Sequence, residues 1–169
     1  DYTISYANNT GVGTATVTAT GDGTTYIGSV STDFQILPVY CVTPDATGGK
    51  NGLAWTDGAG DEGPMTIDEA YGAYTNGDYR ACAILLKTGT YAPATRLWVR
   101  STFVMSGGLA GVDNHTKSAP DAKSVLDGRG VVDLVNVERI PDADTAYFRG
   151  IEFRRAYSTA LRKTDVKYG

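Results

Sequence analysis

The sequence is poor in the residues that build metal and redox centres. It has one histidine and two cysteines in 169 residues, too few for a zinc site of four Cys and His ligands. It has no lysine or arginine before Lys50 and a net charge of −4, which argues against nucleic acid as a partner. No apolar run approaches the roughly 20 residues that span a bilayer, so no membrane-spanning helix is expected. We expect no cofactor.

Glycine and threonine are abundant instead, with 21 glycines and 22 threonines. Hydrophobic residues make up 41% of the chain and charged residues 20%, a balance typical of globular proteins. Turn-forming glycine and β-branched threonine together favour many short strands over a helical bundle. The length suits one domain, or a small domain joined to part of another. Because the sequence opens at Asp1 on strand-like residues, we expect the parent chain to continue beyond both ends.

Residues 1–37 alternate between apolar and polar side chains with the period of half-buried strands. Three strands are expected, over residues 2–6, 14–20 and 29–36. So few strands bury too little apolar surface for an independent core. An apolar face would stay uncovered, formed by Val17, Val30, Phe34 and Ile36. The segment is therefore predicted to pack on missing parts of the parent chain or on a second copy, by strand addition.

One helix is predicted, over residues 66–75, because Thr66 and Glu69 have the spacing of a capping box and Asn76-Gly77 supplies a stop. Its inward positions follow helical spacing and are Ile67, Ala70, Tyr71 and Tyr74. The rest of residues 38–169 consists of short runs bounded by glycine, which excludes an alternating β/α fold and leaves a sandwich or a parallel β-helix. The expected inward strand residues are Ile84, Leu86, Val104, Val125, Val135, Ile151 and Phe153.

Two resemblances to known protein families favour one of these folds. The segments Asp1–Tyr6, Gly13–Gly21 and Phe34–Ile36 resemble the C-terminal half of a bacterial immunoglobulin-like repeat. From residue 39 to about 157, six motifs in order resemble the N-terminal portion of right-handed parallel β-helix proteins of the pectate-lyase-like class, in their bacterial surface-protein branch. The motifs are Tyr40–Asp45, the cap helix, Thr88–Tyr91, Ser106–Gly111, Val125–Gly128 and Arg149–Phe153.

The resemblances imply an all-β chain with two parts. Residues 1–37 would be a partial immunoglobulin-like sandwich, and residues 38–169 the first coils of a parallel β-helix. The helix at about 66–75 would cap the open end of this solenoid. Gly107-Gly108 and Asp127-Gly128 would form corner turns.

The resemblance also directs attention to charged residues along the last strands. Polysaccharide lyases and hydrolases of this class use carboxylates and basic residues on one outer face. The candidates are Asp133, Glu152, Arg154 and Arg155, with Asp127, Asp142 and Asp144 as further carboxylates. No catalytic motif of the class aligns residue by residue, so no catalytic set is predicted. A second acidic group, Asp57, Asp61 and Glu62, has oxygen ligands for Ca²⁺ but lacks EF-hand spacing, and a solvated loop is the alternative.

Cys41 and Cys82 begin strands that the resemblance makes neighbours. A disulfide and a pair of buried free thiols are both open. The aromatic residues that could stack on sugars, or else belong to the core, are Trp98, Tyr147, Tyr157 and Tyr168.

Together these features predict a non-catalytic protein that is secreted or on the cell surface, with a structural or adhesive role as a stalk, display element or fibre subunit. The first alternative is a polysaccharide lyase or hydrolase, and the second is a glycan-binding module. The expected partners are further copies of the chain, missing parts of the parent chain, or glycans.

Overall fold

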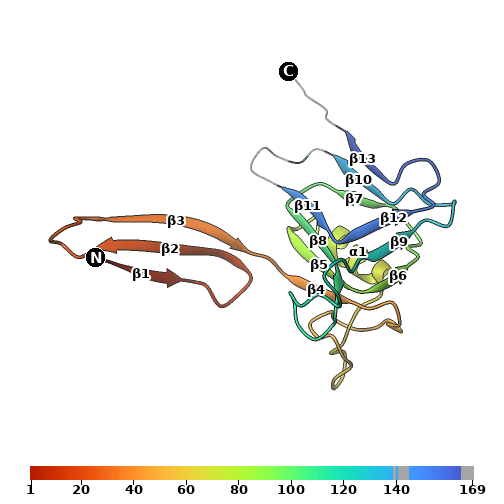
Figure 1. The fold of residues 1–169 in the computed structure, drawn as a ribbon, viewed down its shortest axis with the longest axis horizontal. Helices are drawn as coiled ribbons and strands as arrows, with labels where there is room; N and C mark the ends of the chain where they lie inside the picture. The colour runs from red at the N-terminus through yellow and green to blue at the C-terminus, as the bar shows by residue number, and fades with distance from the viewer. Residues whose placement is uncertain (139, 141–144, 165–169) are drawn as a thin grey trace. The chain divides into compact units, whose positions relative to one another are not determined.

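The computed structural model describes residues 1–138, 140 and 145–164, and the side chains of residues 162–164 are left aside. The chain divides into two compact units, Asp1–Pro38 and a second unit that begins at Val39 (Figure 1). No helix in the described residues has the length and apolar character needed to cross a membrane.

The first unit is one antiparallel sheet of three strands in the order β1-β2-β3. The strands are β1 (Tyr2–Ala7), β2 (Gly13–Gly21) and β3 (Ser29–Ile36). The loop between β2 and β3 is fixed by Asp22, whose Oδ1 accepts the backbone N–H groups of Thr24 and Thr25 at 2.9 Å each. An aspartate that holds the next backbone amides in this way starts a tight turn.

The second unit contains three small parallel sheets, with strand orders β4-β5-β8-β11, β6-β9-β12 and β7-β10-β13. The first sheet consists of β4 (Val39–Val42), β5 (Cys82–Lys87), β8 (Phe103–Leu109) and β11 (Ala146–Arg149). The second consists of β6 (Gly89–Tyr91), β9 (Ser124–Asp127) and β12 (Ile151–Arg154). The third consists of β7 (Leu97–Val99), β10 (Val135–Glu138) and β13 (Leu161–Thr164).

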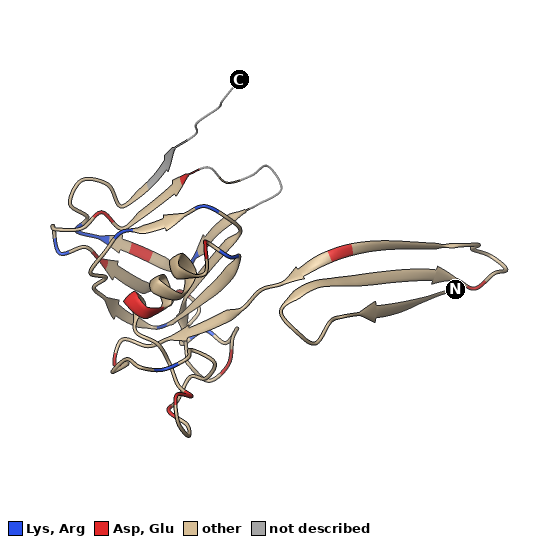
Figure 2. Ribbon diagram, turned by 180° about the vertical axis from the view of Figure 1, so that it is seen from behind, with Lys and Arg blue, Asp and Glu red and all other residues tan. Residues whose placement is uncertain are grey.

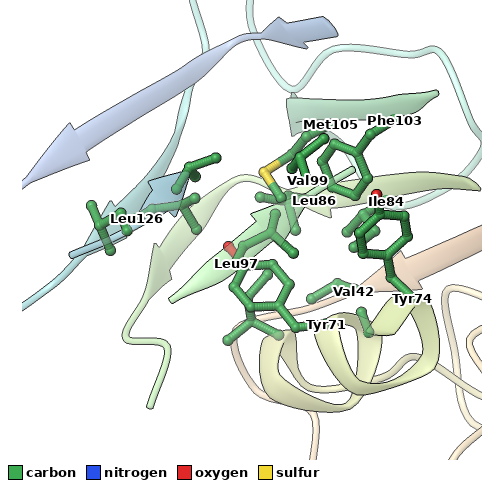
Figure 3. Close-up of a cluster of buried hydrophobic side chains, with 14 of the residues drawn as sticks. Val42, Tyr71, Tyr74, Ile84, Leu86, Leu97, Val99, Phe103, Met105 and Leu126 are labelled. Carbon is green, nitrogen blue, oxygen red and sulfur yellow. The ribbon is translucent and has the colours of Figure 1, made fainter. Parts of the chain in front are cut away.

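The single helix of the described residues, α1 (Ile67–Asn76), starts with the capping box that the sequence contains. Thr66 Oγ1 accepts the backbone N–H of Glu69 at 3.2 Å, and Glu69 Oε2 accepts the N–H of Thr66 at 2.9 Å. The buried side of α1 is formed by Ile67, Ala70, Tyr71 and Tyr74. These side chains belong to the same hydrophobic cluster as the three sheets, so α1 covers the core (Figure 3).

The core contains Ile84, Leu86 and Val135, as expected from the sequence. The expectation is wrong in β8 and β9, where the core residues are Phe103, Met105 and Leu126 instead of Val104 and Val125. The register explains the error in β8, because Met105 lies opposite the inward residue Ile84 and therefore shares its face. Ile151 and Phe153 are partly buried against the cluster.

The predicted fold class is wrong. The chain is mixed, about 6% helical and 42% strand, with several small parallel and antiparallel sheets and no solenoid. A solenoid stacks units of nearly constant length. Here Thr88 alone separates β5 from β6, whereas residues 43–66 separate β4 from α1. The chain is also not all-β, because α1 supplies core side chains, and the first unit is a single sheet, not the two packed layers of a sandwich.

Candidate functional site

The antiparallel sheet of the first unit has one apolar side. Residues that lie directly opposite each other in an antiparallel pair point to the same side of the sheet. Ile4 lies opposite Ala19, and Ala19 lies opposite Val30 on its other flank. The same register gathers a set that we call the apolar face: Tyr2, Ile4, Tyr6, Ala15, Val17, Ala19, Val30, Phe34 and Ile36. Thr32, opposite Val17, is the one polar side chain on this side of the paired strands.

Most of the apolar face is open to solvent. Tyr2 is 69% exposed, Tyr6 58% and Val30 70%, whereas Ala15 is fully buried. Side chains of this kind are normally covered in a folded protein, and contiguous apolar patches mark interaction surfaces. Within the first unit no second layer of strands covers the sheet.

The opposite side of the sheet is hydroxyl-rich and internally hydrogen-bonded. Thr16 Oγ1 donates to Asp33 Oδ1 at 2.7 Å, and the Thr18 and Ser31 hydroxyls are 2.8 Å apart. Gln35 Nε2 donates to Thr14 Oγ1 at 2.8 Å. These polar side chains are hydrogen-bonded to one another and suit contact with solvent, so this side needs no cover. The sheet therefore has one side that suits solvent and one that suits a protein partner.

The carboxylate of Asp133, a predicted catalytic candidate, fastens a turn. Its Oδ1 accepts the backbone N–H groups of Ser158 at 2.8 Å and Thr159 at 2.9 Å, and its Oδ2 is paired with Arg96. The amide of Thr159, followed by that of Ser158, lowers the pKa of Asp133. These contacts give the Asp133 carboxylate a structural role in holding the turn at Ser158 and Thr159.

The other candidates form a separate cluster at the end of β12. Arg155 is paired with Asp127, whose Oδ1 also accepts the N–H of Arg129 at 2.9 Å. Arg154 Nε donates to Glu152 Oε1 at 2.5 Å. The hydrogen bond from Arg154 lowers the pKa of Glu152, and the one from Arg155 lowers that of Asp127. Asp133 has other partners and lies in no pair with this cluster, while Asp142 and Asp144 are outside the described residues.

The positive charge beside the acidic loop of Asp57, Asp61 and Glu62 is the side chain of Lys50. Lys50 Nζ lies 3.8 Å from Asp57 Oδ1 and donates to the carbonyl of Gly60 at 3.2 Å. Backbone bonds close the loop, with the N–H of Gly58 donating to the carbonyl of Glu62 at 3.0 Å. No group of three or more acidic, His or Cys side chains in the described part of the chain is arranged to hold a metal ion.

Cys41 and Cys82 are buried and free. In the pairing of β4 with β5, Cys41 lies opposite Leu85, three residues along the strand from Cys82. That offset is about 10 Å of strand, beyond the roughly 4.4–6.8 Å between Cα atoms that a disulfide needs. The two side chains also face opposite sides of the sheet, because Cys82 belongs to the core whereas Cys41 Sγ lies 3.9 Å from Asn114 Oδ1.

We expect both thiols to be unreactive in the native protein. Burial raises the pKa of Cys41 to about 11 and that of Cys82 to about 12. At pH 8 the thiolate fraction of Cys41 is then on the order of one in a thousand. A chromogenic thiol reagent should detect no thiol within minutes on the native chain and two after denaturation. Rapid labelling of either thiol without denaturant would contradict this burial.

The aromatic candidates do not share one surface. Trp98 lies on β7, Tyr147 is 51% exposed on β11, Tyr157 is 73% exposed after β12, and Tyr168 is outside the described residues. They therefore provide no common platform for a sugar.

Trp98 instead lies between two arginines, Arg96 and Arg100, in a row of side chains that the sequence analysis did not identify. The Cζ atoms of Arg96 and Arg100 lie 5.2 and 5.7 Å from the centre of its ring. Arg100 Nη2 also contacts Glu138 Oε1 at 2.7 Å, which ties β7 to β10. The alternation of these three residues with Leu97 and Val99 was the available signal.

Comparisons with protein-family models, with curated proteins and with solved structures return no match to this chain. The apolar face is thus the strongest candidate for a functional surface, on the evidence of exposure and side-chain chemistry.

Proposed function

We propose that the chain is a non-catalytic structural or adhesive protein that assembles through the sheet of its first unit. The observation that carries this proposal is the exposure of the apolar face, with Tyr2 and Val30 each about 70% accessible. Burial of apolar surface is worth roughly 25 cal/mol per Å², so a covered face is favoured over one left in water. A place outside the cell is part of the proposal and rests on the resemblance of residues 1–37 to a bacterial immunoglobulin-like repeat.

The charged residues support a non-catalytic role. Hydrolysis of a glycosidic bond needs one carboxylic acid that is protonated near neutral pH, which requires a raised pKa. In Asp127, Asp133 and Glu152 the pKa is lowered by hydrogen bonds from neighbouring groups. Each of these carboxylates is also paired with an arginine. The pairs of Asp133 with Arg96 and of Asp127 with Arg155 join segments far apart in the sequence, and the pair of Glu152 with Arg154 lies within β12.

We expect association of the intact chain to depend on concentration. The chain has a mass of 17.9 kDa, and the weight-average mass in sedimentation should rise above this value between about 1 and 300 µM. Added salt should not weaken the association, because apolar contacts are not screened. A constant mass of one chain over this range would refute the proposal.

An activity assay tests the main alternative. Release of unsaturated sugar products from an acidic polysaccharide, lost in an Asp133→Asn variant that still folds, would favour a lyase. Thermal unfolding of the variant should be measured alongside, because Asp133 fastens the turn at Ser158 and Thr159.

A further inference from the structure

We propose that the apolar face of one chain packs against the apolar face of a second copy, so that two three-stranded sheets form a two-layer sandwich. This inference rests on the proposed function, since it names the partner of the surface through which the chain assembles. Two sheets that pack face to face bury their inner side chains in a layer about 10 Å thick. The hydroxyl-rich sides would then both face water.

The charge pattern favours a second copy over a charged partner. The described strands of the first unit carry no lysine or arginine, as the absence of blue in Figure 2 shows. The one charged side chain on these strands, Asp33, lies on the hydroxyl-rich side, where it accepts a hydrogen bond from Thr16. Contact between two apolar faces thus buries no charge and brings no like charges together. A basic or acidic partner would find no complementary group on this face.

The strand order allows one copy to cover the face of the other completely. A two-fold axis that runs along the central strand β2 places β1 of each copy over β3 of the other, and every contact is reciprocal. The central strand presents Ala15, Val17 and Ala19, whereas β1 presents the larger Tyr2 and Tyr6. The large side chains of the outer strands can therefore extend over the smaller residues at the centre.

Pairing at the strand edges would leave this face exposed. A strand added to β1 or β3 extends the sheet sideways and satisfies backbone groups at the edge. It does not cover Tyr2, Tyr6 or Val30, which project from the side of the sheet. Only a second layer removes these side chains from water.

The contact is small, so the association is expected to be weak. Three strands about 4.8 Å apart and roughly seven residues long give a footprint of about 340 Å² per copy. Stable complexes bury on the order of 800 Å² of accessible surface per partner. We therefore expect dissociation constants on the order of 10 µM or weaker.

Cysteine protection tests the face directly. Val17 and Thr18 are neighbours on the central strand, both are half-buried, and their side chains point to opposite sides of the sheet. Val17→Cys places a thiol on the apolar face, and Thr18→Cys is the matched control. The natural cysteines contribute little background because both are buried. For a dissociation constant near 10 µM, the labelling rate of Val17→Cys should fall by about sevenfold between 1 and 300 µM protein, while that of Thr18→Cys stays constant.

A pair of charge variants gives a second measurement. Ala19→Asp puts a carboxylate on the apolar face and should abolish the rise of mass with concentration, whereas Thr18→Asp should retain it. If the wild-type mass rises but Val17→Cys is labelled equally fast at all concentrations, the face-to-face contact is wrong and the proposed assembly stands. Assembly that survives in Ala19→Asp would overturn the contact in the same way. A wild-type chain that stays monomeric refutes the proposed function itself.

Discussion

Replacement of Tyr74 by alanine is expected to destabilise the second unit by about 3–5 kcal/mol, because it removes one of the largest fully buried side chains and leaves a cavity. The ring lies 5.1 Å from that of Phe103 and 5.5 Å from that of Tyr79, between centroids. The Tyr74 hydroxyl oxygen also accepts the backbone N–H groups of Arg100 at 2.9 Å and Ser101 at 3.2 Å. Chemical denaturation followed by tryptophan fluorescence would measure the loss.

Two conservative variants on α1 separate packing from hydrogen bonding. Tyr74→Phe keeps the ring and should cost about 1–2 kcal/mol, because two backbone donors lose their acceptor. The hydroxyl of Tyr71 is buried without a hydrogen-bond partner among the described residues. Tyr71→Phe should therefore be neutral or stabilising by up to about 1 kcal/mol. Equal losses for the two phenylalanine variants would contradict this difference in hydrogen bonding.

Replacement of Gly108 by alanine is the second change for which we expect a large effect. Gly108 has φ +73°, and a Cβ there would overlap the carbonyl oxygen of Ala122 and lie 2.5 Å from its carbonyl carbon. Both atoms are backbone and cannot move aside without displacing the segment before β9. We expect a loss of about 3 kcal/mol or more, from backbone strain and overpacking together.

Gly130 is the matched control for this position. Its φ is +75°, but no atom lies within 4 Å of an added Cβ. Gly130→Ala should therefore cost only about 1 kcal/mol, the strain of a left-handed backbone alone. Denaturation midpoints of the two variants give the comparison. A Gly108→Ala variant no less stable than Gly130→Ala would show that the contact with Ala122 relaxes easily.

The elements with local signals were the ones that sequence could predict. The capping box of Thr66 and Glu69 lies within four residues, and its hydrogen bonds need no tertiary contact. The alternation in residues 2–6 and 14–20 likewise gives the strands and the sidedness of the first sheet. These features depend on neighbouring residues, so the sequence alone contains them.

Features that depend on long-range pairing were harder. In β8, Phe103-Val104-Met105 is apolar throughout, so alternation cannot tell which residues face inward. The pairing of Met105 with Ile84 decides it, and that register is absent from the local sequence. The prediction of the fold class was wrong for a related reason. The order of short motifs does not show that the segments between the strands differ in length.

The candidate site shows the same division. Exposure of the apolar face could be anticipated because three strands are too few to cover it. The roles of the charged residues could not, because Asp133 meets its partners Ser158 and Thr159 only across a separation of about 25 residues. The sequence alone does not distinguish a carboxylate that fastens a turn from one that activates a water molecule.

The wide sequence separation of the parallel strands governs how the second unit can be made. Val39 pairs with Ala83, and Thr90 with Val125, so each strand emerges from the ribosome well before its neighbour exists. Contacts of such high contact order slow folding and leave unpaired edges exposed to aggregation in the meantime. The first sheet, built from adjacent hairpins, can close once Ile36 has emerged from the ribosome. Newly made chains would thus display the apolar face before the second unit has folded, and the order of synthesis favours early encounters between first units.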